Sequence, residues 1–282
     1  MNPTTAPPVP VTARLGLEVT ATPVGVEVAV DLDGRWDAGD TVCLPGVAAL
    51  LCDAATGSAV AVADPSRSIS TALLSLDITG VPRDGRLRAI ATTDVARGDY
   101  VRATAVVRDG GGLEVARATS WWARRERRPA PPPGPATDRA APRRAAADTG
   151  LGATPLGRWL GLVPAPVAPG DDVAFALADV GELRNRSGTL HGGVGALLAQ
   201  LAAVRAVDDG VTRPDVLSLT CHYLRAAGTA TTPVHVSGAR VRRGRTSAVA
   251  RGVVHAHDGR AAMLADVTVA FARPTDDERA SR

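Results

Sequence analysis

Residues 185–200, NRSGTLHGGVGALLAQ, contain the residue types and spacing of a possible reactive site. A polar loop leads through His191, Gly192 and Gly193 into a run of small apolar residues that predicts a buried helix. The first amides of a helix have no partners within it, and its N-terminus carries partial positive charge. Gly192 leaves room for close approach to the backbone. The junction is therefore suited to stabilising negative charge that develops on a bound oxygen atom.

A second candidate is Asp53, which lies in the apolar run GVAALLCDAATG, residues 46–57. An acidic side chain in such a run is costly unless it has a partner or a task. Asp53 follows Gly46 by about two helical turns, so both residues lie on one helix face. Burial would raise the pKa of this carboxyl group, which suits a general base. The alternative is a partly exposed acid near the end of the helix.

The two candidate segments are related by an internal repeat. With Gly46 aligned to Gly193, an offset of 147 residues, TVCLPGVAALLCDAATG matches TLHGGVGALLAQLAAVR and Asp53 falls opposite Gln200. Each half then consists of an opening segment, a strand, a loop, one long apolar helix and three or four alternating strands. So long a period indicates a duplicated domain and not a solenoid. One helix beside a run of antiparallel strands predicts an α+β architecture for each half.

A Pro-, Ala- and Arg-rich segment, residues 124–150, separates the repeats and predicts a semi-extended linker. The two domains are accordingly predicted over 11–123 and 151–275, with long helices over 46–57 and 193–208. The linker holds seven arginines and three acidic residues, within a chain whose formal net charge is only +3. The basic pI is therefore mostly a property of the linker, and we expect no nucleic-acid partner.

Cysteine usage and hydropathy bear on the compartment. Cys43, Cys52 and Cys221 lack the spacing of a metal site or a disulfide framework, which favours buried thiols in a reducing compartment. The N-terminus lacks the basic start and apolar core of a secretory signal. No stretch reaches the roughly 18 apolar residues that a membrane helix needs. These patterns predict a cytoplasmic protein with no metal and no membrane partner.

The loop–helix junction resembles the hotdog fold and, more narrowly, the phenylacetyl-CoA-type acyl-CoA thioesterases. The family pattern has Asn, then His-Gly-Gly six residues later, then Asp nine residues after the His. Asn185, His191 and Gly192 fit this spacing, but Gln200 stands where the Asp is expected. The resemblance is good over 151–275 and weaker over 11–123.

The first half departs from the family pattern in the opposite way. Ala38 and Leu44 replace the Asn and the His, whereas Asp53 keeps the acidic position. Neither half holds a complete set of these groups, and together they hold one.

The resemblance implies two tandem hotdog domains, each a long buried helix wrapped by an antiparallel sheet, paired as an intramolecular pseudo-dimer. Each site of such a pair takes its Asn and Gly from one domain and its Asp from the other. The residues expected in the complete composite site are Asp53, Asn185, His191 and Gly192. The residues expected in the second, inactive site are Leu44, Pro45, Gly46 and Gln200.

The activity implied by the resemblance is hydrolysis of an acyl-CoA thioester without a cofactor. The Gly192 N–H would bind the thioester oxygen as it becomes an oxyanion. Asp53 would either activate water as a general base or attack the carbonyl directly and form an anhydride. Asn185 and His191 would support the loop. The sequence leaves both roles of Asp53 open.

The turn RVRRGRT offers candidate contacts for the phosphates of coenzyme A, because arginine forks suit phosphate. The substrate-binding candidates are Gly193, Arg242, Arg243 and Arg245. The alternative for the three arginines is an exposed hairpin tip. Two chains packed through their sheets would form a homodimer of such double domains.

Two other functions compete with the thioesterase. Loss of half of the catalytic groups permits a non-catalytic acyl-CoA-binding or regulatory module, although retention of Asp53 in the complementary half favours an enzyme. Hotdog dehydratases and hydratases use a His and a Glu, or an Asp-x-Asn-Pro-x-His run. No Asp-x-Asn-Pro-x-His run occurs in this chain, which disfavours that function.

Overall fold

The computed structural model describes residues 10–38, 43–126, 151–228 and 232–271. Its first half contains α1 Pro10–Leu15, β1 Glu18–Thr22, β2 Gly25–Asp31, η1 Gly34–Trp36, α2 Cys43–Ala63, β3 Arg67–Ile78, β4 Arg86–Arg97, β5 Tyr100–Asp109 and β6 Glu114–Glu126. Its second half contains η2 Leu151–Ala153, α3 Pro155–Leu160, β7 Leu162–Pro164, β8 Val173–Leu177, η3 Gly181–Leu183, α4 Gly192–Arg205, β9 Pro214–Tyr223, β10 Val234–Arg243, β11 Ser247–His255 and β12 Ala261–Phe271. The linker predicted over 124–150 lies outside the described residues from residue 127 onward.

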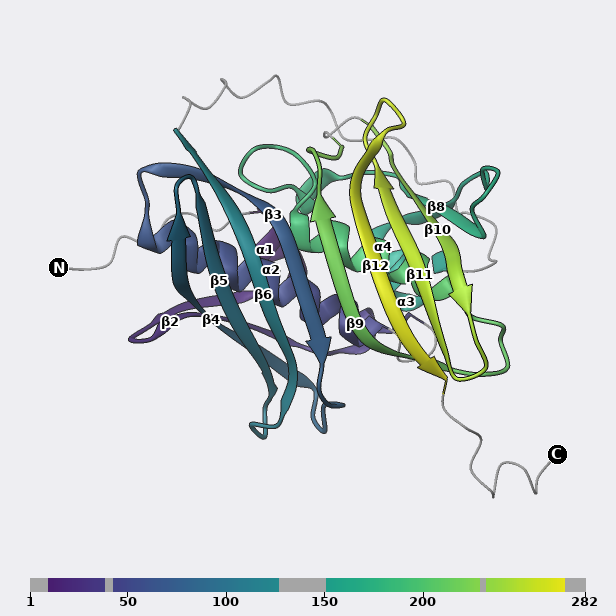
Figure 1. Ribbon diagram of the computed structural model, residues 1–282, viewed down its shortest axis with the longest axis horizontal. Helices are drawn as coiled ribbons and strands as arrows, with labels where there is room; N and C mark the ends of the chain where they lie inside the picture. Colours follow the sequence, from purple (N-terminus) through teal and green to yellow (C-terminus); the bar gives the residue numbers. More distant parts are fainter. Residues whose placement is uncertain (1–9, 39–42, 127–150, 229–231, 272–282) are drawn as a thin grey trace.

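The strands of both halves form one 12-stranded antiparallel sheet, and the two long helices lie behind it (Figure 1). The strand order is β1-β2-β4-β5-β6-β3-β9-β12-β11-β10-β8-β7. Read outward from the β3–β9 seam, the two halves give the same sequence of elements. The predicted pair of tandem α+β domains is thereby confirmed.

The register of the seam shows that the two halves are related by a two-fold axis. Leu74 of β3 pairs with Cys221 of β9, which is its own counterpart 147 residues later. The flanking pair Leu73–His222 is matched by the pair Ser75–Thr220 in the same way. An axis through the Leu74–Cys221 pair therefore exchanges the two halves.

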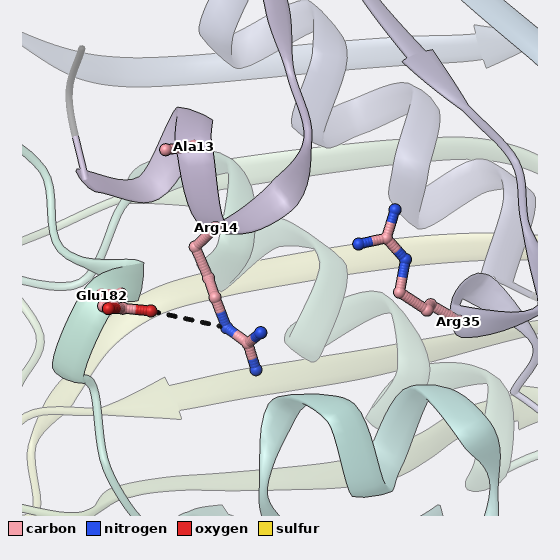
Figure 2. Close-up of a pocket in the computed structure, with 4 residues that line it drawn as sticks. All are labelled: Ala13, Arg14, Arg35 and Glu182. Atoms are coloured by element: carbon pink, nitrogen blue, oxygen red, sulfur yellow. Dashed lines mark ion pairs between the residues drawn. The ribbon is translucent and has the colours of Figure 1, made fainter.

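Short elements of both halves also meet beside the helices. Arg14 of α1 and Glu182 of η3 point toward one another, with Nε and the carboxylate 3.9 Å apart (Figure 2). Trp36 of η1 packs edge-on against Trp159 of α3, with ring centroids 5.0 Å apart. The halves are thus joined on the helix side as well as through the sheet.

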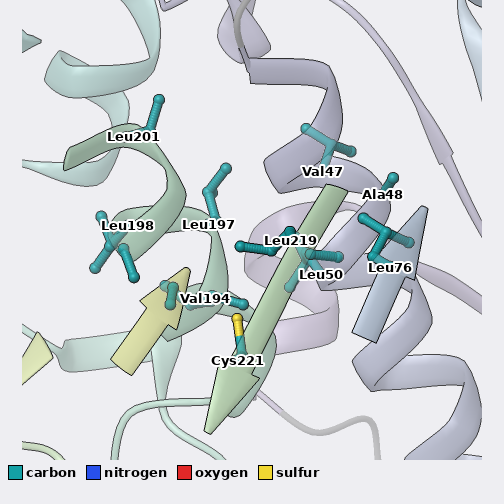
Figure 3. Close-up of a cluster of buried hydrophobic side chains, with 14 of the residues drawn as sticks. Val47, Ala48, Leu50, Leu76, Val194, Leu197, Leu198, Leu201, Leu219 and Cys221 are labelled. Carbon is teal, nitrogen blue, oxygen red and sulfur yellow. The ribbon is translucent and has the colours of Figure 1, made fainter. Parts of the chain in front are cut away.

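The two long helices run antiparallel and pack tightly at two glycines. A Cβ atom on Gly193 would lie 2.9 Å from the Cα atom of Leu50, and one on Gly46 would lie 3.3 Å from the Cα atom of Leu197. The offset of 147 residues relates Gly46 to Gly193 and Leu50 to Leu197, so the two-fold axis exchanges these two contacts. Leu50 and Leu197 lie in the buried cluster between the helices, together with Leu219 of the seam (Figure 3). Gly193 in particular must be glycine, because the Leu50 backbone cannot move away from a Cβ atom.

Helix α2 is longer than the predicted 46–57, because the Ala- and Val-rich sequence after Gly57 continues it to Ala63. Its residues Leu44–Ala63, with a mean hydropathy of 1.6, are long and apolar enough to cross a membrane by length and composition. The expectation that no stretch reaches this length is therefore wrong. Most of the segment, 78 %, is buried inside the protein, where it forms the core of the first half.

Two of the three cysteines lie in the hydrophobic core, Cys52 in the first half and Cys221 in the second. Cys52 and Cys221 are free and fully buried, and burial raises the pKa of both thiols. The nearby Asp53 carboxyl group adds to that rise in pKa. Both therefore act as small apolar side chains. The side chain of Cys43 lies outside the described residues.

Candidate functional site between the two halves

The N-terminus of α4 is capped by a histidine. His191 is extended, with φ −63° and ψ 135°, and its Nδ1 atom accepts a hydrogen bond of 3.1 Å from the Gly193 N–H. The first helical hydrogen bond runs from the Gly195 N–H to the His191 carbonyl, at 3.0 Å. Gly192 therefore stands at the first helical position, whose amide has no acceptor within the helix.

The loop that leads into α4 is organised by Asn185. Its Oδ1 atom accepts from the Ser187 N–H at 2.9 Å, and its Nδ2 atom donates to the Thr189 hydroxyl at 3.0 Å. The loop is tied back at its other end, where the His191 N–H donates to the Leu183 carbonyl at 3.0 Å. The side-chain contacts of Asn185 are thus those of a loop-forming residue.

Asp53 of α2 reaches this junction from the other half. Its side chain is 3 % exposed, and its Oδ2 atom lies 3.6 Å from His191 Nδ1. The Thr71 hydroxyl of β3 donates to Asp53 Oδ1 at 2.8 Å. A Cβ atom on Gly192 would lie only 2.9 Å from Asp53 Oδ2. The structure therefore brings Asp53, His191 and Gly192 together across the two halves.

Thr71 and Tyr223 were not predicted as site residues. The Tyr223 hydroxyl lies 3.5 Å from the Gly192 carbonyl oxygen and hydrogen-bonds the Asp53 carboxylate. Burial raises the pKa of Tyr223 well above its usual value, and the neighbouring Asp53 carboxyl raises it further, so the phenol keeps its proton. β3 lies against the acid because it packs on α2 of the same half, whereas β9 is brought there by its pairing with β3. No spacing within the sequence signals either contact.

The electrostatics of the cluster are set by burial. Burial raises the pKa of Asp53, while the His191 imidazole and hydrogen bonds from Thr71, Gly193 and Tyr223 oppose that rise. Burial also lowers the pKa of His191, which fits an Nδ1 atom that accepts a hydrogen bond. A buried carboxyl group with a raised pKa is a stronger base once it is ionised.

Comparisons with known proteins agree with this fold. A family model described as the acyl-CoA thioesterase N-terminal domain matches residues 182–272. A solved structure titled as a conserved protein with hot dog fold, from Alicyclobacillus acidocaldarius, is 13 % identical, with a TM-score of 0.61 over 92 % of this chain and 97 % of that one. This chain is a double hotdog. The resemblance and the fold predicted from the sequence are both confirmed.

Two further structures share the double hotdog over nearly their whole length. A tesB protein of Mycobacterium avium subspecies paratuberculosis is 12 % identical, with a TM-score of 0.64 over 93 % of this chain and 98 % of that one. The acyl-CoA thioesterase II TesB2 of Mycobacterium marinum is 12 % identical, with a TM-score of 0.58 over 94 % and 98 %. No curated protein matches the chain by sequence.

The opposite end of the hotdog helix pair has a different composition. There Leu44 and Pro45 occupy the positions of His191 and Gly192. A Cβ atom on Gly46 would lie 2.8 Å from the side-chain oxygen of Gln200, so an amide takes the place of the carboxylate. This end has neither an acid nor a histidine at the corresponding positions.

Of the predicted substrate-binding residues, Gly193 lies beside Asp53. The three arginines of the turn at residues 240–246 do not. Arg243 donates to the Val207 carbonyl and to Asp209, and its guanidinium stacks 4.2 Å above the Phe271 ring. Val207 follows the C-terminal end of α4, which is about 20 Å long. The hairpin of Arg242, Arg243 and Arg245 is therefore at the opposite end of the helix from Gly192.

Within the residues that the structure describes, no three His, Cys, Asp or Glu side chains gather as a metal site would require.

Proposed function

We propose that this chain hydrolyses an acyl-CoA thioester at a composite site between the hotdog halves. The observation that carries the proposal is the position of Asp53: a buried carboxyl from one half lies beside the first amides of α4 in the other. The match of residues 182–272 to an acyl-CoA thioesterase domain supports this reaction class.

The Gly192 N–H is the donor for the developing oxyanion. It stands at the first helical position, where the partial charge of the helix N-terminus adds to the hydrogen bond. A preorganised donor of this kind lowers the barrier by about 3 kcal/mol. The His191 cap fixes the direction of this amide, because its Nδ1 atom holds the next N–H of the turn.

Asp53 acts on the water as a general base. As the water oxygen bonds to the thioester carbon, its proton passes to the Asp53 carboxylate and the carbonyl electron pair moves onto oxygen. Collapse of this intermediate breaks the C–S bond, and the leaving thiolate takes the proton from Asp53. The products are a carboxylic acid and free coenzyme A. The Thr71 hydroxyl keeps Asp53 Oδ1 occupied, so Oδ2 is the oxygen that faces Gly192.

The alternative role of Asp53 is nucleophilic attack through an anhydride. A single turnover in H2(18)O separates the two routes. General-base catalysis places the heavy oxygen in the carboxylic acid product. Water attack on the Asp53 carbonyl of an anhydride places it in Asp53 instead, where peptide mass spectrometry would find it.

The function is tested by assaying thiol release from a panel of short, branched and aryl CoA esters. We expect Asp53→Asn to abolish turnover, because the amide cannot take the proton, while Gln200→Ala leaves turnover unchanged once folding has been checked by thermal melting. Equal loss in both variants would refute the single composite site. Binding of CoA esters without turnover of any of them would support the non-catalytic module instead.

The cytoplasmic location and the homodimer of double domains stay predictions from the sequence. Neither enters the mechanism proposed for the composite site.

A further inference from the structure

The indole of Trp122 in β6 lies beside the composite site. Trp122 is paired in register with Thr71 of β3, whose hydroxyl donates to Asp53. On α2, Gly57 follows Asp53 by about one helical turn, so both residues lie on the same helix face. A Cβ atom on Gly57 would lie 2.6 Å from Cη2 of the Trp122 ring. Strand pairing and helix packing therefore both place this indole next to Asp53.

Trp122 is held in one position. Its Nε1–H donates to the Ser120 hydroxyl at 2.8 Å, and that hydroxyl donates to the Ala103 carbonyl at 3.3 Å. The residue is only 6 % exposed, and the Gly57 backbone lies against the ring where a side chain would overlap it. The indole therefore cannot move aside for a ligand without breaking these contacts.

The arrangement of a glycine facing an indole is found in the first half only. The counterpart of Gly57, 147 residues later on α4, is Val204, which is fully buried. A side chain thus fills the space at that helix position. The indole and the glycine that makes room for it belong to the half that supplies Asp53.

An apolar cluster extends from Trp122 into the first half. Its buried members, with Ile69 of β3 packed against them, are Val60, Val101, Ala103 and Trp122. The exposed residues Arg186 and Ser187 belong instead to the loop that leads into α4. The coenzyme A part of a thioester is polar and remains in solvent, whereas burial of an apolar acyl group is favourable. The cluster therefore offers the acyl group an apolar direction, away from that loop.

We propose that the acyl group of the substrate points toward Trp122, and that the indole closes this end of the site and limits the substrates to short acyl chains. This assignment rests on the proposed thioesterase function and names the size of the acyl group. One methylene group in a fixed apolar pocket changes discrimination by roughly 10- to 200-fold. A rigid indole therefore sets a steep limit on chain length.

Met263 of β12 borders the site on its other side. It is paired in register with Tyr223, and its Cε atom would lie 2.7 Å from a Cβ atom on Gly195 of α4. A methionine side chain is unbranched and flexible, so it can rearrange around a ligand. Met263 therefore does not set the limit on chain length.

The test measures kcat/KM for straight-chain acyl-CoAs from acetyl to decanoyl. We expect the wild type to prefer short chains, and Trp122→Leu to raise the ratio of octanoyl-CoA to butyryl-CoA hydrolysis about tenfold or more. Leucine keeps the position apolar, and thermal melting checks the fold. Trp122→Phe, which removes less volume, gives a smaller shift in the same direction and serves if the leucine variant does not fold.

The matched control is the neighbouring tryptophan. Trp121 follows the alternation of the strand onto the opposite face of the sheet, where it is paired with Leu73 and Arg102. We expect Trp121→Leu to leave the chain-length profile unchanged. A purely structural role of Trp122 would lower kcat/KM equally for every chain length, and that result would overturn the proposal.

Binding of S-alkyl-CoA thioethers, measured by calorimetry, separates this proposal from the function on which it rests, because a thioether has no carbonyl group to hydrolyse. If no thioester is hydrolysed but S-butyl-CoA binds more tightly than S-octyl-CoA, and Trp122→Leu removes the difference, the size limit stands and only the catalytic proposal fails. The size limit is overturned if the wild type accepts long and short chains equally or binds no thioether. It is also overturned if Met263→Ala shifts the profile and Trp122→Leu does not.

Discussion

The two ends of the helix pair are related by the same two-fold axis and yet differ in every position that matters for chemistry. The first end is filled by Gly192, Asp53, Thr71 and Tyr223. Their counterparts 147 residues away are Pro45, Gln200, Ser218 and Leu76. The backbone is repeated at both ends, but the donors and the acid are not.

The proline is the most informative of these differences. Pro45 stands where Gly192 offers an N–H, and proline has no backbone N–H to donate. Gln200 in turn cannot take a proton as Asp53 can. In two identical subunits one sequence would have to serve both sites. Once the repeats are fused, one end is free to lose its chemistry while it keeps the packing that the other end requires.

The strongest test of this difference replaces Gly192 at the first end by proline, the residue that its counterpart Pro45 supplies at the second end. Gly192→Pro removes the amide donor, and we expect a loss of about 10² to 10³ in kcat beyond that of Gly192→Ala. The helix should survive, because proline is tolerated in the first turn and His191 already has an extended ψ of 135°.

Steady-state assays of both variants measure this effect. Gly192→Ala keeps the N–H but adds the Cβ atom that crowds Asp53, so the ratio between the variants reports the donor alone. Pro45→Gly at the other end leaves activity unchanged. Equal activities of the proline and alanine variants would show that this amide is not the oxyanion donor.

Packing at the two glycines should be unequal despite the symmetry. A Cβ atom on Gly193 meets the backbone of Leu50, which cannot yield, whereas one on Gly46 first meets side-chain ends, at 2.4 Å from Leu197 Cδ1. We expect Gly193→Ala to lower the free energy of unfolding by about 1–3 kcal/mol and Gly46→Ala by less. Chemical denaturation of both variants measures the difference. A larger cost at Gly46 would contradict the packing described here.

Loss of the Thr71 hydroxyl, which hydrogen-bonds Asp53, should lower activity, whereas loss of the hydroxyl at the counterpart Ser218 should not. Thr71→Val removes a hydrogen bond to the carboxylate, so we expect kcat/KM to fall about tenfold near neutral pH. This bond lowers the pKa of Asp53, so its loss raises that pKa and shifts the rising limb of the pH–rate profile to higher pH. Ser218→Ala, at the counterpart position, should leave the profile in place, and a shift in both variants would argue against a single site.

The smallest expected effect is a pH-dependent change in stability that is caused by the buried carboxyl group of Asp53. The pKa of Asp53 is raised by burial above its unfolded value of about 3.9. The folded protein therefore keeps this proton where the unfolded chain has released it, and stability falls as pH rises from about 4 through the folded-state pKa. Asp53→Asn removes that loss, so at neutral pH we expect a gain of about 1 kcal/mol, or roughly 3 °C in Tm.

Thermal melts over a series of pH values check this prediction. The gain should vanish near pH 4, below which both states of the wild type hold the proton. A gain of the same size at every pH would mean that the carboxyl group is not the cause.

Much of the fold could be predicted from the sequence, because it depends on local pattern and on repetition. The alternating strands, the two apolar helices and the offset of 147 residues each follow from residue types alone. The end of α2 was placed six residues too early, since nothing in its Ala- and Val-rich continuation marks a stop.

The sequence by itself determined which groups the chain possesses: a His-Gly-Gly helix start in one half and a lone buried acid in the other. It could not determine what surrounds them, because Thr71 reaches Asp53 through the packing of β3 against α2, and Tyr223 reaches it through the pairing of β3 with β9 of the other half. It also gave the hairpin arginines a role near the site, although α4 separates them from Gly192 by its whole length. Contacts between residues far apart in the chain depend on how the two halves pair, and that pairing is decided only by the packing of the helices and the register of the seam.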